Sequence, residues 1–344
     1  MPAPQPDRQR RSEPGNYSAG MSAYPVLDIN SGDPDRRDIV PTSDKRLALS
    51  RARLIGGAAF LVAVVSLAAR AGSGPLTVPK AIILGSVEGI TEFLPISSTG
   101  HLLVTQRLLG LGTGAGKTAA DTYAVAIQVG AIAAVVMIYW GRIAQMIKGL
   151  FGRDSEGLRL LTRLAVAFLP SAVVGTILSG PIKDRLFGPW PVVIAWAVGG
   201  VFLLVWKPKP GTISITDLTL KHAAIIGCAQ VLALWPGTSR SLATIVAGLA
   251  IGCTMAATVE FSFLLGLATL SAATILDLAK DGGTLVADYG WATPALGTLV
   301  AFGTGLLAVR WLVSYLRTRP LTIFGWYRLA IAAVTVVLIA TGAI

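Results

Sequence analysis

The chain has 344 residues, of which 53% are hydrophobic and only 14% are charged, and its net charge is +11. Soluble domains carry about 25% charged residues, so this composition indicates an integral membrane protein and argues against a soluble enzyme. We expect the positive charge in basic loops on the cytoplasmic side of a bilayer, and we expect no nucleic-acid partner. The two cysteines, Cys228 and Cys253, form no CxxC pair, which argues against a zinc site or a disulfide framework.

The N-terminal segment differs from the rest of the chain. Residues 1–53 contain 9 Lys and Arg and 7 Asp and Glu, and few large apolar residues. Such a segment cannot bury enough apolar surface to fold, so it predicts a disordered cytoplasmic tail. An uncharged apolar run follows at 54–69. It is slightly short for a span but begins too deep in the chain for a signal peptide, so we predict an extra transmembrane helix over about 54–72 and a main domain over 73–344.

Six further apolar segments are long enough to cross a bilayer. Six of the eight tryptophans lie at or near their ends, where an amphipathic ring prefers to sit. The predicted spans cover about 122–140, 161–182, 189–206, 257–277, 291–312 and 323–342.

Two other apolar segments, 80–109 and 221–252, are interrupted by Pro, Gly, Ser and charged residues. Broken apolar segments at corresponding positions of two halves indicate a binding site buried in the membrane. The segments align at an offset of 142 residues, which pairs Glu88 with Gln230. With one residue dropped, the next pairs are Pro95 with Pro236, Ser97 with Thr238, Ser98 with Ser239 and Thr99 with Arg240.

This pattern predicts an all-α membrane protein built from two copies of one unit, about 80–206 and 218–344, joined by a polar linker over 207–217. Each unit is a re-entrant helix pair followed by three spans, and the odd number of spans inverts one copy relative to the other. With the tail inside, 12 Lys and Arg residues, Arg328 among them, fall in cytoplasmic loops and 7 fall outside, as the positive-inside rule expects. The first broken segment then opens outward and the second inward, and we expect their tips to meet at mid-membrane.

Few ionisable residues lie at the predicted membrane depth. Placing a charge there costs at least ~2.5–3.5 kcal/mol, so such residues indicate a functional site rather than an ion pair that only joins the repeats. Glu88 and Glu92 share one helix face, and two carboxylates suit Mg²⁺ or Ca²⁺, or one base beside one metal ligand. We expect Glu260, with Gln128 as a counterpart, to support this site by contacting the residues that form it. The residues concerned are Glu88, Glu92, His101, Arg240 and Glu260.

Each break is followed by a helix start rich in hydroxyl groups. Free backbone amides at such a start can bind an anion, and Arg binds phosphate through a planar fork. Together with the carboxylates, these groups predict a site for a phosphate or diphosphate bridged by a divalent cation. The two runs are Ser97-Ser98-Thr99-Gly100-His101 and Pro236-Gly237-Thr238-Ser239-Arg240-Ser241.

The run EGITEFLPISSTGH from Glu88 to His101 and the run PGTSRS from Pro236 to Ser241 resemble the two signature motifs of the bacterial undecaprenyl-diphosphatase (bacitracin-resistance) family. The resemblance covers about 75–344. It implies a plasma-membrane enzyme that hydrolyses undecaprenyl diphosphate to the monophosphate, which recycles the lipid carrier for peptidoglycan synthesis and gives bacitracin resistance. It also implies a divalent-cation requirement, a polyprenyl diphosphate substrate and an active site toward the outer face. A homodimer is compatible with it.

Carried over to this chain, the resemblance implies that Ser98 is the nucleophile, Glu92 a base or metal ligand, and Glu88 a support for the metal or the Ser98 hydroxyl. His101 would be a general acid or base, or a phosphate contact. Two other nucleophiles remain open: the His101 imidazole and a metal-activated water. The candidate phosphate-binding residues are Ser97, Thr99, Gly237, Thr238, Ser239 and Arg240.

A transporter or lipid flippase is the rival function, because transporters also use inverted repeats with helices broken at mid-membrane. The combination of two carboxylates, a serine and a histidine supplies more reactive groups than binding requires, which favours an enzyme. Fold analogy alone would not separate the two functions.

Overall fold

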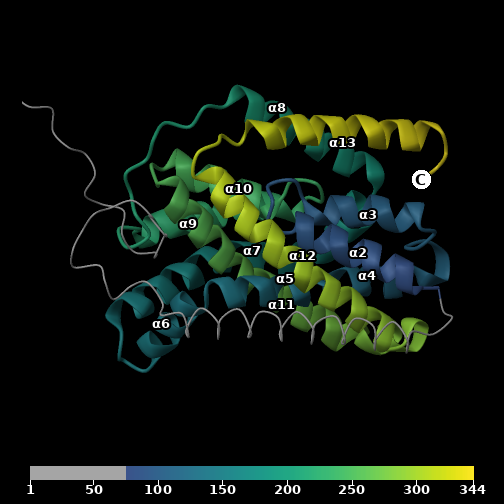
Figure 1. Ribbon diagram of the computed structural model, residues 1–344, viewed down its shortest axis with the longest axis horizontal. Coiled ribbons are helices and arrows are strands. Elements are labelled where there is room, and N and C mark those ends of the chain that lie inside the picture. The colour runs from purple at the N-terminus through teal and green to yellow at the C-terminus, as the bar shows by residue number, and fades with distance from the viewer. Residues whose placement is uncertain (1–74) are drawn as a thin grey trace, which may run out of the picture. The chain divides into compact units, whose positions relative to one another are not determined.

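The computed structural model describes residues 75–344, drawn as ribbon in Figure 1. The predicted tail over 1–53 and the predicted extra span over 54–72 lie outside these residues. Within the described part the chain is α-helical, and its extended pairing is limited to one isolated bridge between Ile213 and Cys253. The prediction of an all-α membrane protein is therefore confirmed for this part of the chain.

Each half of the described chain begins with a broken segment and continues with further helices. The first half contains α2 (Val78–Thr91), α3 (Ser98–Leu108), α4 (Lys117–Ala126), α5 (Gln128–Ile138), α6 (Trp140–Leu150), α7 (Ser155–Leu186) and α8 (Pro189–Val205). The second half contains α9 (Leu220–Gln230), the short 3-10 helix η3 (Val231–Leu234), α10 (Arg240–Ala250), α11 (Met255–Tyr289), α12 (Ala292–Leu316) and α13 (Thr322–Ala340).

By length and composition, five helical segments among the described residues can cross a membrane, and a sixth if a bent pair counts as one span. Several helices extend past the predicted spans. α11 continues to Tyr289, well past the predicted end at 277, because charged residues end an apolar run but not a helix. The stretch between the first two predicted spans, which we had assigned to a loop, contains the helix α6. The five segments are Lys117–Ile138, Ser155–Leu178, Met255–Tyr289, Ala292–Leu316 and Thr322–Ala340, and the bent pair is Gly180–Leu186 with Pro189–Val205.

Both broken segments are interrupted where the sequence predicted, and the two breaks share an unusual backbone. Ser97 and Ser239 precede α3 and α10 with φ of 72° and 76°, and they are the non-glycine residues with positive φ in the described chain. Each caps its helix, Ser97 by accepting the amide of Gly100 and Ser239 by accepting that of Leu242. Left-handed backbone at a non-glycine residue is uncommon, so its appearance at both breaks marks them as matching structures.

These matching turns correct the sequence alignment of the two halves. α3 and α10 have 11 residues each, and they start at Ser98 and Arg240, 142 positions apart. The one-residue gap was therefore wrong: Ser97 corresponds to Ser239, and Ser98 corresponds to Arg240. The gap had been placed to match two prolines, but counting back from the two helix starts puts Pro95 opposite Gly237 and not opposite Pro236.

The first helix of each half packs against a long helix of the other half. α2 packs against α12, and α9 packs against α7. A side chain on Gly85 of α2 would overlap the carbonyl oxygen of Gly297, and one on Gly227 of α9 would overlap that of Ala167. α8 and α13 lie side by side, as Figure 1 shows along its upper edge. Glycine thus allows the first helix of each half to approach the other half at backbone distance.

The two breaks meet each other, as we expected. The Ser241 hydroxyl donates a hydrogen bond to the carbonyl of Leu94 at 2.9 Å, and the Ser239 hydroxyl lies 3.4 Å from the same oxygen. The hydroxyl groups after the second break therefore satisfy a backbone acceptor in the first.

Arg328 of α13 makes hydrogen bonds to both breaks. Our assignment of this residue to a cytoplasmic loop was therefore wrong. Its side chain is fully buried, and its guanidinium donates to four backbone carbonyls. Chain turns leave such acceptors without helical donors, and a guanidinium with five N–H groups can serve several at once. The acceptors are Pro95 at 3.3 Å, Thr238 at 3.2 Å, Gly237 at 2.9 Å and Ala195 of α8 at 2.8 Å.

We predict that Arg328→Met lowers the stability of the protein severely. Each carbonyl left buried without a donor costs about 1–3 kcal/mol, so the melting temperature in detergent should fall by about 10 °C. Arg328→Lys keeps three N–H donors, so its melting temperature should lie between those of the wild type and Arg328→Met. Arg310→Met, on an exposed position of α12, is the matched control and should behave as wild type. A normal melting curve for Arg328→Met would show that the hydrogen bonds from Arg328 to the four carbonyls do not stabilise the protein.

Candidate functional site

A carboxylate, a hydroxyl and a guanidinium meet where the two breaks join. Glu92, directly after α2, accepts a short hydrogen bond from the Ser98 hydroxyl through Oε2. Its Oε1 lies 3.2 Å from Nη2 of Arg240, the first residue of α10. Ser98 and Glu92 are buried, and the Arg240 side chain is only 10% exposed. The structure thus brings together three predicted site residues from both broken segments.

Arg240 is held on several sides. Its Nη1 donates to the backbone carbonyl of Ser262 in α11 at 2.9 Å, and its Cζ lies 5.4 Å from the ring centroid of Phe93. An aromatic face at this distance attracts a cation, and more strongly so when water is excluded. The guanidinium is therefore preorganised before any ligand arrives.

Glu88 lies one helical turn before Glu92 and is completely buried. Neither of its carboxylate oxygens has a hydrogen-bond partner in the described part of the chain. A buried carboxyl group without a donor is costly, so this group requires a proton, a water or a cation. The described residues contain no cluster of three or more His, Cys, Asp and Glu that could enclose a metal. Two carboxylates nevertheless fit Mg²⁺, which is commonly held by one or two carboxylates together with substrate phosphates.

His101 lies on α3, and both of its ring nitrogens have partners. Nδ1 is 2.7 Å from the carbonyl oxygen of Ser97, and Nε2 is 2.8 Å from the hydroxyl of Tyr327 in α13. The ring stacks on Tyr327 and contacts Trp196 of α8, with centroid distances of 5.6 and 4.8 Å. The sequence analysis missed both aromatic partners. They belong to no motif, and aromatic residues are ordinary in apolar membrane helices.

A cavity of about 780 Å³ opens from this group of residues. Of the ten predicted site residues, six border it and four do not. Gly237 and Thr238 instead direct their carbonyls to Arg328. The six that border the cavity are Glu92, Ser97, Ser98, Thr99, Ser239 and Arg240, and the four that do not are Glu88, His101, Gly237 and Thr238.

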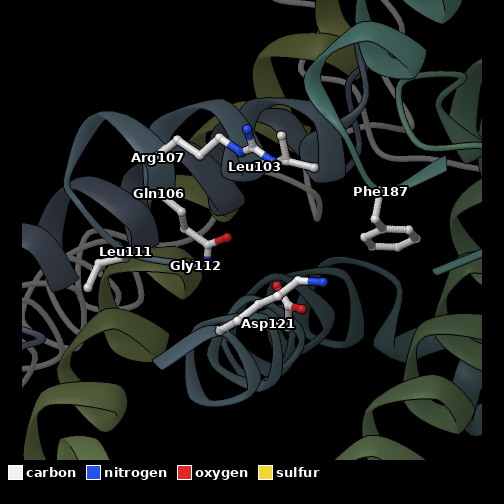
Figure 2. A pocket seen from close by; sticks show the side chains of 8 residues that line it. Leu103, Gln106, Arg107, Leu111, Gly112, Asp121 and Phe187 are labelled. Carbon is white, nitrogen blue, oxygen red and sulfur yellow. The ribbon is translucent and has the colours of Figure 1, made fainter. Parts of the chain in front are cut away.

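The cavity is long, with a polar far end. Thr269 and Lys280 of α11 both line it, and eleven residues of helix correspond to about 17 Å. Its middle walls are largely apolar, including Leu103, Phe168 and Leu270. Figure 2 shows a small side pocket of about 20 Å³ that shares part of this lining, with Leu103, Gln106 and Arg107 of α3 opposite Asp121 of α4. The shape suits an apolar chain with a polar head at the Ser98 end.

Glu260 and Gln128, which we expected to support the site together, have different surroundings. Glu260 is buried and forms a 2.5 Å ion pair with Arg142 of α6. Gln128 lines the cavity, and its Oε1 is buried without a hydrogen-bond partner. Glu260 therefore connects α6 to α11, whereas Gln128 belongs to the cavity wall.

Comparisons with known proteins show which family the chain belongs to. Residues 81–334 match the family model described as bacitracin resistance protein BacA. A protein of Sorangium cellulosum named undecaprenyl-diphosphatase is 45% identical over 261 residues, which cover 74% of this chain and 83% of that protein. Proteins of Psychrobacter sp. and Rhodospirillum rubrum, named undecaprenyl-diphosphatase and undecaprenyl-diphosphatase 2, are 42% and 43% identical, over 77% and 74% of this chain and 96% and 92% of their own lengths. The chain therefore belongs to the bacitracin resistance protein BacA family.

Proposed function

We propose that this chain hydrolyses undecaprenyl diphosphate to undecaprenyl phosphate and inorganic phosphate at the Glu92–Ser98–Arg240 group. The activity is the one named for its relatives, and family membership supports roles in lipid-carrier recycling and bacitracin resistance. One observation carries the site assignment: a serine hydroxyl bonded to a buried carboxylate, which also contacts an arginine, at one end of a long cavity with largely apolar walls.

In this proposal the Ser98 oxygen attacks the terminal phosphorus while Glu92 accepts the hydroxyl proton. The new Oγ–P bond forms as the bond from phosphorus to the bridging oxygen breaks, and undecaprenyl phosphate leaves with the electron pair. Glu92 releases its proton to solvent. Water then attacks the phosphoserine, Glu92 accepts the water's proton and returns it to the Ser98 oxygen, and inorganic phosphate leaves.

Arg240 is assigned to the terminal phosphate, where a planar fork can stabilise the charge on the phosphate oxygens. The first-turn amides of α3 and α10 add two helix N-termini that favour an anion. We assign the hydroxyls of Ser97, Thr99 and Ser239 to the same phosphates because all three residues border the cavity. Gly237 and Thr238 contribute through the turn that they form.

Glu88 and Glu92 would hold the divalent cation, Mg²⁺ or Ca²⁺. The support for this assignment is the unpaired, fully buried carboxylate of Glu88, one turn from Glu92. When bound, the ion would neutralise charge on the diphosphate oxygens and so favour attack by an oxygen nucleophile.

The surroundings of His101 favour Ser98 as the nucleophile. Both imidazole nitrogens are engaged, and the residue does not border the cavity. We therefore assign His101 to holding the turn before α3 through the Ser97 carbonyl. A water activated beside Glu92 remains the second candidate nucleophile.

We also propose the inverted-repeat arrangement, with units over 80–206 and 218–344. The equal offset of 142 residues between the two serine turns and the reciprocal contacts of α2 with α12 and α9 with α7 support it. The cavity end at Lys117 and Lys280 supports an opening toward the outer face, because the charge distribution assigns both lysines to that side.

Ser98→Ala should reduce phosphate release from undecaprenyl diphosphate by at least about 10²–10³-fold, and Arg240→Ala should have an effect of similar size. Arg240→Lys keeps the charge but loses the fork, so it should also be clearly impaired. Ser98→Cys should retain part of the activity, since a thiol can attack. The measurement is phosphate release by purified protein in detergent, with Ser155→Ala as the control at an exposed serine. Normal turnover by Ser98→Ala would exclude the serine and favour water.

Chelation should abolish turnover, and added Mg²⁺ or Ca²⁺ should restore it. Glu88→Gln removes a ligand charge without changing the side-chain size, so it should raise the cation concentration needed for half-maximal activity by about 10-fold or more. The titration of activity with cation, in wild type and variant, measures both effects. Full activity in the presence of EDTA would refute the metal role of the two glutamates.

A further inference from the structure

The guanidinium of Arg240 lies against the backbone of α11 at one glycine. A Cβ atom built on Gly266 would lie 2.5 Å from Cζ and 2.6 Å from Nη2 of Arg240. The atoms nearest to this Cβ belong to the guanidinium group and not to any backbone. Ordinary contacts between such atoms are about 3.5–4.0 Å long, so a methyl group here and the guanidinium in its present place exclude each other.

The position of Gly266 matches the other contacts of the guanidinium. Ser262, whose carbonyl accepts from Nη1 of Arg240 at 2.9 Å, lies four residues earlier on the same helix. Residues four apart lie on one face of a helix. This face of α11 therefore presents the carbonyl of Ser262 and, one turn later, the space left by the missing side chain of Gly266. Phe93 faces the same guanidinium at 5.4 Å, and Glu92 accepts from Nη2 at 3.2 Å. The missing side chain thus completes a slot that fits a planar group.

We propose that Gly266 is a positioning residue for phosphate transfer: the absence of its side chain sets where the Arg240 fork lies relative to Ser98. This inference rests on the proposed function. An alanine methyl would push the guanidinium away by about 1 Å, since 2.5 Å must become an ordinary contact. A misplacement of about 1 Å can cost about 10²-fold in rate.

The effect should fall on catalysis more than on stability. The displaced atoms are the far end of a flexible side chain, which can move without shifting either helix. Alanine is also a better helix former than glycine. The charge of Arg240 stays in the site, so substrate binding should suffer less than turnover, and kcat should fall more than KM rises.

α11 offers a matched control. Gly283 lies on the same helix, and a Cβ built on it meets no atom within 4 Å. Gly266→Ala and Gly283→Ala therefore make the same chemical change in the same helix, with and without the guanidinium in contact. We expect kcat to fall by about 10–10²-fold in Gly266→Ala and to stay at the wild-type value in Gly283→Ala, with both proteins melting near or above wild type.

A double-mutant cycle with Arg240→Lys tests the route of the effect. A lysine ammonium has no planar group to fill the slot, so Gly266→Ala should reduce kcat by less than about 3-fold in this background. An equal loss in both backgrounds, or a wild-type kcat for Gly266→Ala, would overturn the proposal. If the single variant fails to fold, recovery of the folded protein on adding Arg240→Lys supports the contact, and continued loss overturns it.

The proposed function fails on a different result. If wild type releases no phosphate, or if Arg240→Lys turns over as wild type does, the assignment of Arg240 to the phosphate is wrong. The Gly266 inference fails alone when Arg240→Lys is impaired while Gly266→Ala is not.

Discussion

The structure depends on pairing the backbone groups that the two helix breaks expose. Helical backbone satisfies itself, but a break inside a membrane protein must find its partners within the protein, because lipid supplies none. Here the second break serves the first, since Ser241 donates to the carbonyl of Leu94, and Arg328 of α13 donates to Pro95, Gly237 and Thr238 together. The bonds that stabilise the junction also place Ser98 and Arg240 side by side, so fold and site share one set of interactions.

Charge balance at the junction explains how several ionisable groups can be buried together. Glu92 takes both the Ser98 hydroxyl and the Arg240 guanidinium, so its negative charge is compensated before a ligand arrives. The Glu88 carboxylate has no hydrogen-bond partner among residues 75–344, and a bound cation would compensate its charge. A diphosphate would bring negative charge to Arg240, while the cation would bring positive charge to the glutamates. Ligand and ion are therefore expected to depend on each other.

Much of the fold was predictable because the relevant signals are local. Apolar length gave the spans, and Pro, Gly and charge inside two apolar segments gave the breaks. Glu92 and Arg240 could be chosen from the sequence, because charge at membrane depth is costly and so indicates function, whereas Ser98 was chosen through the resemblance to the family motifs. Local signals failed to align the two halves where residues of one type occupy different structural positions. Pro95 and Pro236 look equivalent in sequence, yet the starts of α3 and α10 put Pro95 opposite Gly237 by position.

The sequence by itself determined the class of protein, the two broken segments and six of the residues that line the cavity, since each depends on composition, motif or spacing along the chain. Only the tertiary structure decided which groups face one another. It buried Arg328 among carbonyls from three distant segments and turned His101 toward Tyr327. It also set Arg240 against Gly266. The sequence does not distinguish an arginine in a cytoplasmic loop from one buried next to an active site. The partners of Arg328 are backbone carbonyls, and since every residue has one, no sequence motif marks them.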